Sequence, residues 1–186
     1  MATQAVKNCI ERDDAVKNEI VGPMMGTEWP TARRFPDRVV QNHTQLGDIG
    51  FRVRDLGPGE SPADSLWLLD ESHVFVGDLV YNGMHAYLAD GCYDDWLTRL
   101  AELESSTDRD ATLYVGHGEP AGVQLFATQR RYVETFVDAV RRNLSATPDE
   151  RREAIVREMK RLLPSDDLSF LMELSIEPVA ARLGAS

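Results

Sequence analysis

Apolar residues in the middle of the chain follow the pattern of β-strands. Residues 51–54 alternate apolar and polar side chains, which predicts a half-buried strand. The segments 65–69 and 73–76 are nearly continuous in apolar residues, as in strands of a sheet interior. Asp70-Glu71-Ser72 separates these two segments and predicts a hairpin turn. The second segment leads into Gly77-Asp78, where we expect the strand to end.

A helix follows these strands, and another strand follows the helix. Residues 94–103 place their apolar side chains on one helical face. A short apolar segment at 111–115 then leads into Gly116-His117-Gly118. Because strand, helix and strand in succession form a crossover unit, we expect the strands at 73–76 and 111–115 to be parallel neighbours.

The last third of the chain predicts three helices. An apolar stripe runs from Val123 to Val140. Thr147-Pro148-Asp149-Glu150 is a capping box with proline at the first helical position, and it opens a helix to about Leu163. Ser165-Asp166-Asp167 is expected to cap a final helix, which Pro178 ends or kinks.

The N-terminal region is more polar. Residues 4–21 show weak helical periodicity, and residues 22–36 predict a long loop because proline interrupts them repeatedly. Loops of this length are usually functional lids or have lost a packing partner. We therefore expect a single α/β (α+β) domain over residues 1–186, with a helix and lid-like loop at 1–48, a sheet at 49–120 and C-terminal helices at 121–186.

Composition narrows the class of protein. The chain is 42% hydrophobic and 27% charged, as globular proteins are, and no apolar run reaches membrane-spanning length. A formal net charge of −11 argues against binding to nucleic acid or to an anionic membrane. Cys9 and Cys92 are too few for a disulfide framework. The first 14 residues lack the apolar stretch of an export signal, so a cytoplasmic location is expected.

Two residues next to predicted strand ends carry the candidate chemistry. Taken singly, Asp78 is typical of a turn aspartate and His117 of a hydrogen-bonded loop histidine. Taken together, they would meet at one rim, because neighbouring strand ends in such folds bring their loops together. A carboxylate and an imidazole in that position are ligands that Zn²⁺, Mn²⁺ or Fe²⁺ accept.

The ordered set of motifs resembles the C-terminal half of a metallo-β-lactamase-fold hydrolase. The match covers residues 51–140 and rests on Gly57-Pro58-Gly59-Glu60-Ser61-Pro62, Ser65-Leu66-Trp67-Leu68, Val74 to Val80, Trp96, and Leu113 to Pro120. The resemblance implies half of an αββα sandwich with a binuclear metal site along one edge. It also implies that Asp78 bridges the two metals and that His117 binds the second. The implied reaction is hydrolysis of an ester, thioester, lactone or similar bond by metal-bound hydroxide.

The chain departs from the family pattern at two places. The family's His-x-His-x-Asp-His motif is absent, and Glu60 stands where a ligand histidine is usual. Candidate metal ligands are therefore Asp78, His117 and Glu60, although a solvated loop glutamate is the favoured interpretation of Glu60. Tyr81, Asn82 and His85 could line a pocket for a small-molecule substrate, with loop packing slightly favoured instead.

The missing half has consequences for packing and for activity. It would leave one face of the sheet uncovered, since the N-terminal region is polar and interrupted by proline. We therefore expect a homo-oligomer or a partner chain that supplies the missing half. Two functions stay open. The first is a metal-dependent hydrolase completed by such a partner, and the second is a degenerate, non-catalytic relative that acts as a binding protein.

Overall fold

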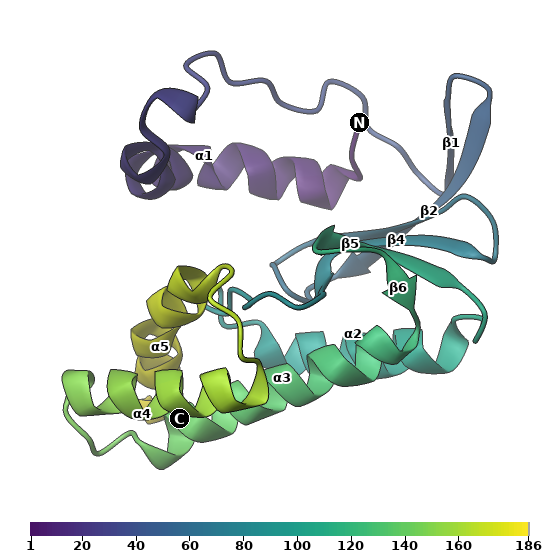
Figure 1. Cartoon of the computed structure of the whole chain (residues 1–186). Helices are drawn as coiled ribbons and strands as arrows, with labels where there is room; N and C mark the ends of the chain where they lie inside the picture. Colours follow the sequence, from purple (N-terminus) through teal and green to yellow (C-terminus); the bar gives the residue numbers. More distant parts are fainter. Residues whose placement is uncertain (186) are drawn as a thin grey trace.

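A six-stranded sheet with its strands in chain order forms the centre of the computed structural model, which describes residues 1–185 (Figure 1). Neighbouring strands are antiparallel except for β4 and β5, which are parallel. The strands are β1 His43–Leu46, β2 Ile49–Gly57, β3 Asp64–Leu68, β4 His73–Tyr81, β5 Thr112–His117 and β6 Ala121–Gly122.

The expected hairpin and crossover are both confirmed. Strands β3 and β4 pair with Trp67 opposite Phe75, and the Asp70 side chain closes the turn by accepting hydrogen bonds from the backbone N–H groups of Ser72 and His73. Helix α2, Tyr93–Ser106, then carries the chain to β5, which pairs in parallel with β4. The carboxyl ends of these two strands therefore lie at one edge of the sheet.

Strand β4 does not end at Gly77 as expected. Gly77 has a φ of 56° and sits at a register shift, after which the strand continues through the buried residues Leu79, Val80 and Tyr81. A positive φ is easy for glycine, so the chain makes a β-bulge here instead of a turn. Asp78 consequently projects from an irregular part of a strand and is not in a loop.

The core lies between the sheet and the helices on one of its faces (Figure 1). Helix α2 and helix α3, Gln124–Arg142, pack beneath the sheet, while helix α4, Pro148–Leu162, and helix α5, Ser169–Gly184, pack against α3. Alternate side chains of the central strands are buried against these helices. The fully buried residues include Leu66, Val74, Val76, Leu113, Trp96, Leu100, Phe126, Val133 and Phe136.

Of the two C-terminal helix starts, one is confirmed and one is corrected. The capping box at Thr147 and Glu150 is present at α4. Helix α5, however, begins at Ser169 after Leu168 in a left-handed conformation, and residues 165–167 form a separate turn in which the Ser165 hydroxyl accepts from the Asp167 N–H. The helix also continues through Pro178 to Gly184, so proline does not end it.

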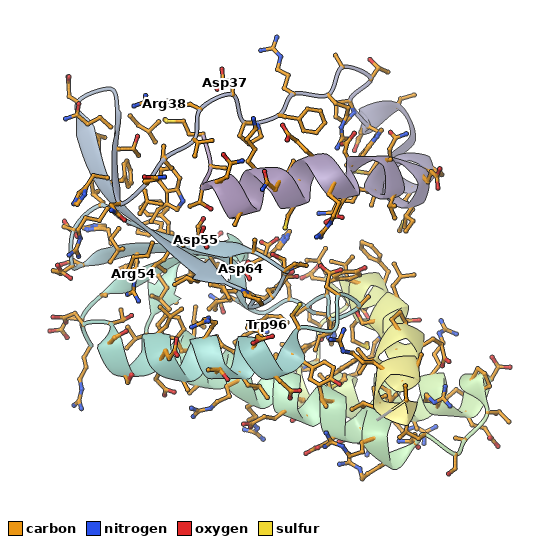
Figure 2. The ribbon with its side chains drawn as sticks, turned by 180° about the vertical axis from the view of Figure 1, so that it is seen from behind. Asp37, Arg38, Arg54, Asp55, Asp64 and Trp96 are labelled. Carbon is orange, nitrogen blue, oxygen red and sulfur yellow. The ribbon has the colours of Figure 1, made fainter. Side chains whose placement is uncertain are left out.

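Helix α1, Gln4–Met25, lies on the opposite side of the sheet from the other helices (Figures 1 and 2). It runs through Pro23, so the expected loop begins only after a short 3₁₀ turn at Gly26–Glu28. The helix buries none of its own residues. It is attached at its start, where Ala2 exchanges backbone hydrogen bonds with residues 38 and 40. No helix within residues 1–185 is both long and apolar enough to cross a membrane.

Candidate metal centre

Asp78 and His117 lie side by side at the carboxyl-terminal edge of β4 and β5. The distance from His117 Nε2 to Asp78 Oδ1 is 3.7 Å, and the two side chains are 39% and 48% exposed. That distance is too long for a hydrogen bond, and both groups reach solvent. The pair can therefore offer one imidazole nitrogen and one carboxylate oxygen to a cation between or beside them.

The glycines that flank His117 allow this close approach. A Cβ atom on Gly116 would lie 1.7 Å from Asp78 Oδ1, so the backbone of β5 passes directly against the Asp78 carboxylate. Gly118 has a φ of 99°, and a Cβ there would lie 2.2 Å from the backbone oxygen of Asn82. Side chains at these two positions would push β5 and the segment after β4 apart.

Tyr81 and Asn82 hold the His117 segment in place. The Tyr81 ring stacks on the His117 imidazole with centroids 5.1 Å apart and planes 16° apart. The Asn82 backbone N–H donates to the His117 carbonyl at 2.9 Å, and the Asn82 side-chain amide donates to the Glu119 carbonyl at 2.8 Å. Both residues thus contact the segment that carries a candidate ligand, and their contact with a substrate stays a prediction.

Glu60 is buried, so the expectation of a solvated loop glutamate is wrong. Its exposed fraction is 9%, and the Tyr81 hydroxyl donates to Glu60 Oε1 at 3.4 Å. Burial, followed by the nearby carboxylates of Asp78, Asp64 and Asp90, raises the pKa of Glu60 well above its usual value. The loop is drawn inward at Gly59, where a Cβ would lie 2.7 Å from both Asp64 and Leu79.

Asp64 is an acidic neighbour that the sequence did not single out. Its carboxylate accepts hydrogen bonds from the backbone N–H of Ser61 at 3.1 Å and from the Ser61 hydroxyl at 3.2 Å. Burial nevertheless raises its pKa to about 6. In the sequence, Ser61-Pro62-Ala63-Asp64 indicates only a turn before a strand, because the carboxylates that approach Asp64 are brought there by folding.

These residues do not complete a metal centre by themselves. Within the described part of the chain, no group of three or more His, Cys, Asp or Glu side chains is arranged to hold a metal ion. Glu60, the third candidate ligand, contacts the Tyr81 hydroxyl. The remaining histidines lie elsewhere, with His43 on β1 and His73 paired with Asp70. The structure therefore brings together two ligand-type side chains, Asp78 and His117, and a catalytic zinc commonly needs three.

His85 lies inside the protein, away from the edge. Its ring is fully buried, with Nδ1 2.9 Å from the Tyr132 hydroxyl and Nε2 3.1 Å from the Ser165 carbonyl. Since Nε2 must donate to that carbonyl, Nδ1 accepts from the tyrosine. Both ring nitrogens are thus used in packing α3 and the α4–α5 connection against the segment after β4.

The burial of His85 predicts a dependence of stability on pH. Burial lowers the pKa of His85 below the ordinary value of 6.5, so the unfolded chain binds a proton more readily than the folded one. The contribution of His85 to stability is therefore complete above pH 6.5 and declines as the pH falls below it. We expect urea unfolding at pH 7.5 and 5.5 to show that His85→Asn loses less free energy of unfolding at the lower pH than the unaltered chain does.

The control for this prediction is His43→Asn, because His43 is exposed on the edge strand β1. This variant should keep the full loss of stability between the two pH values. An equal loss in His85→Asn and in the unaltered chain would contradict a neutral, buried His85.

Solved structures resemble this fold. No protein-family model and no curated protein sequence matches the chain. A β-lactamase domain protein from Burkholderia ambifaria aligns with a TM-score of 0.61 and 16% identity over 100% of this chain. A metallo-β-lactamase family protein from Thermus thermophilus aligns with a TM-score of 0.57 and 18% identity over 95% of this chain. The DIM-1 metallo-β-lactamase aligns with a TM-score of 0.51 and 15% identity over 72% of this chain.

The chain spans less than two thirds of each of these structures. It covers 58% of the Burkholderia protein, 63% of the Thermus protein and 55% of DIM-1. At this level of identity the likeness concerns the fold alone. This chain therefore has the metallo-β-lactamase fold over part of the length of the matched structures.

Proposed function

We propose that this chain contributes Asp78 and His117 to a metal-dependent hydrolase centre that is completed by ligands from polypeptide outside these 186 residues. The observation that carries the proposal is the 3.7 Å approach of His117 Nε2 to Asp78 Oδ1 from adjacent parallel strands. The metal would be Zn²⁺, Mn²⁺ or Fe²⁺, which accept this pair of ligand types. The substrate class would be esters, thioesters, lactones or similar bonds, as the resemblance implies.

The electrostatics of the edge support a cation in this position. Burial raises the pKa of Glu60, and repulsion from the three carboxylates of Asp78, Asp64 and Asp90 raises it further. A cation at the edge would reduce this repulsion. With two ligands the chain alone should bind a metal weakly, since affinity depends on the number and rigidity of the ligands.

Zinc binding by the purified chain tests the proposal. We expect equilibrium dialysis to detect weak binding of Zn²⁺ and to show that Asp78→Ala and His117→Ala each reduce the affinity by about tenfold or more, because each removes one ligand. His73→Ala is the matched control, since His73 also pairs with an aspartate, at 2.9 Å, but away from the edge. It should bind zinc like the unaltered chain. Equal losses in all three variants, or no bound transition metal in any state, would refute the proposal.

The alternative function is a non-catalytic binding protein that keeps the scaffold. Two observations favour it, which are the absence of a three-ligand group within residues 1–185 and the engagement of Glu60 by Tyr81. In a protein of this kind, Asp78→Ala and His117→Ala would leave the affinity for its binding partner unchanged in every assay. Loss of a measured activity in these two variants, with the His73→Ala control unaffected, would decide for the hydrolase.

A further inference from the structure

A cavity lies where the segment after β4 meets α3 and the end of α4. Its volume is about 170 Å³. A cavity of about 150 Å³ is large enough for a benzene ring, so this one can hold an organic molecule of similar size. The residues that line it include Tyr81, Met84, Gln129, Arg131, Leu162 and Leu163.

Gln129 gives this cavity a buried hydrogen-bond donor without a partner. The residue is 3% exposed, and its Oε1 accepts from the backbone N–H of Tyr81 at 3.0 Å. Because an N–H must be met by an oxygen, this contact fixes the orientation of the amide and leaves Nε2 as the free end. Among the described residues, Nε2 finds no hydrogen-bond acceptor. A buried donor of this kind is costly, which indicates that an acceptor is missing from the cavity.

Arg131 adds a positive charge to the same cavity. Other arginines of α3 are paired, as Arg130 is with Glu104 and Arg141 is with Asp138. Arg131 forms no such ion pair within residues 1–185. No acidic side chain of the described residues lines the cavity, although the chain has 31 acidic residues against 20 basic ones. The cavity therefore combines a neutral donor and a cation without an acid to neutralise them.

Apolar side chains form another part of the lining. Leu162 and Leu163 are partly buried against the core, and Met84 is half-buried. The Gln129 nitrogen is covered in the structure, so a ligand reaches it only when a lining side chain moves aside. Met84 and Arg131 are long and flexible, and they can make such a movement at little cost.

We propose that this cavity binds a small organic carboxylate with a compact apolar body, of about the size of benzoate. The carboxylate would accept hydrogen bonds from Gln129 Nε2 and from the Arg131 guanidinium, and the apolar body would pack against Met84, Leu162 and Leu163. A carboxylate suits two donors of this kind because each of its two oxygens accepts, and the bond to a guanidinium is strengthened by charge. The inference goes beyond the proposed function, because it needs neither a metal nor further polypeptide.

Tyr81 connects this cavity to the edge that carries the candidate metal ligands. Its backbone N–H donates to Gln129, and its ring stacks on the His117 imidazole. The candidate metal ligands Glu60, Asp78 and His117 are not among the described residues that line the cavity. A carboxylate in the cavity would therefore be a second molecule, bound apart from any substrate at the metal edge.

Titration of the full purified chain with benzoate, without added metal and followed by ¹H–¹⁵N NMR, tests the inference. We expect the side-chain amide signal of Gln129 to shift and to saturate, because its nitrogen gains an acceptor. Benzamide keeps the ring and the carbonyl group but has no charge, so it should bind about tenfold more weakly than benzoate.

Arg131→Gln tests the cation separately. The side chain is exposed, so the variant is expected to fold, to bind benzoate about tenfold more weakly and to bind benzamide as before. Arg141→Gln is the matched control, since Arg141 is an exposed arginine of the same helix that pairs with Asp138. It removes the same charge from the chain and should leave both affinities unchanged.

Three results would overturn the inference. A Gln129 amide signal that benzoate leaves in place would show that the cavity takes no carboxylate. Equal binding of benzamide and benzoate would contradict the assignment of a charged ligand. Equal weakening by Arg131→Gln and Arg141→Gln would show that benzoate responds to the overall charge of the chain and not to this cavity.

Discussion

Replacing Gly116 with alanine is expected to lower the free energy of unfolding by about 2–3 kcal/mol and to break the Asp78–His117 pair. The new Cβ would lie 1.7 Å from Asp78 Oδ1 and 3.0 Å from the Asp78 backbone nitrogen. The carboxylate would have to rotate away, and the backbone contact would keep β5 from settling into its place beside β4. Urea unfolding measures the first effect, and zinc binding measures the second.

The control for Gly116→Ala is Gly50→Ala on β2. A Cβ at Gly50 meets no atom within 4 Å, so this substitution should change the stability by no more than about 0.5 kcal/mol. Adding Asp78→Ala to Gly116→Ala removes the nearest clashing oxygen and should recover part of the lost stability. Additive losses in the double variant would contradict the contact between these two residues.

Truncation of Trp96 to alanine is expected to cost about 3–5 kcal/mol of stability. The Trp96 side chain is 1% exposed on α2, on the helix side of the sheet (Figure 2), and its Nε1–H donates to the Leu79 carbonyl at 2.9 Å. That carbonyl belongs to the residue after Asp78, so the tryptophan fixes the strand segment that carries the candidate ligand.

Trp96→Phe separates the two contributions of this side chain. Phenylalanine retains most of the apolar contact but leaves the Leu79 carbonyl without its donor, so a loss of about 1–3 kcal/mol is expected. Trp29→Ala serves as the control for truncation, because Trp29 packs beside α1 outside the core, where Asn18 and Arg33 contact its ring. Equal destabilisation by Trp96→Ala and Trp29→Ala would contradict the central position of Trp96.

The parts of the fold that the sequence predicted are those with local signals. The β3–β4 hairpin depends on Asp70, whose carboxylate bonds to the turn two and three residues later. The start of α4 depends on a box of four consecutive residues. In both cases the residues that make the structure are neighbours in the chain, so the pattern and the contact coincide.

The errors arose where one local signal is compatible with two structures. Gly77 permits a positive φ, which serves a turn or a bulge equally, and the burial of the residues after it favours the bulge. Pro23 and Pro178 lie inside helices, since proline disfavours but does not exclude helical backbone around it. Ser165 and Asp167 bond to each other and form a turn of their own, so they do not cap α5.

One contact of the candidate site could be predicted from the sequence, and the others could not. The approach of Asp78 to His117 follows from the parallel pairing of β4 and β5, which the crossover pattern predicts. The surroundings of Glu60 and His85 do not follow from local sequence. Glu60 is hydrogen-bonded to Tyr81, 21 residues later in the sequence. His85 is hydrogen-bonded to Tyr132 and Ser165, which follow it by 47 and 80 residues. Such contacts are set by the packing of the whole chain.

The most direct measurement of the central claim is ¹⁵N NMR of the histidine side chains during titration of the full chain with Zn²⁺. We predict that the Nε2 resonance of His117 shifts first and farthest, and that Asp78→Ala abolishes this shift while His73→Ala leaves it intact. If the His117 resonance stays unchanged while another histidine responds, or if Asp78→Ala has no effect on it, then Asp78 and His117 do not bind one cation together and the proposed centre is wrong.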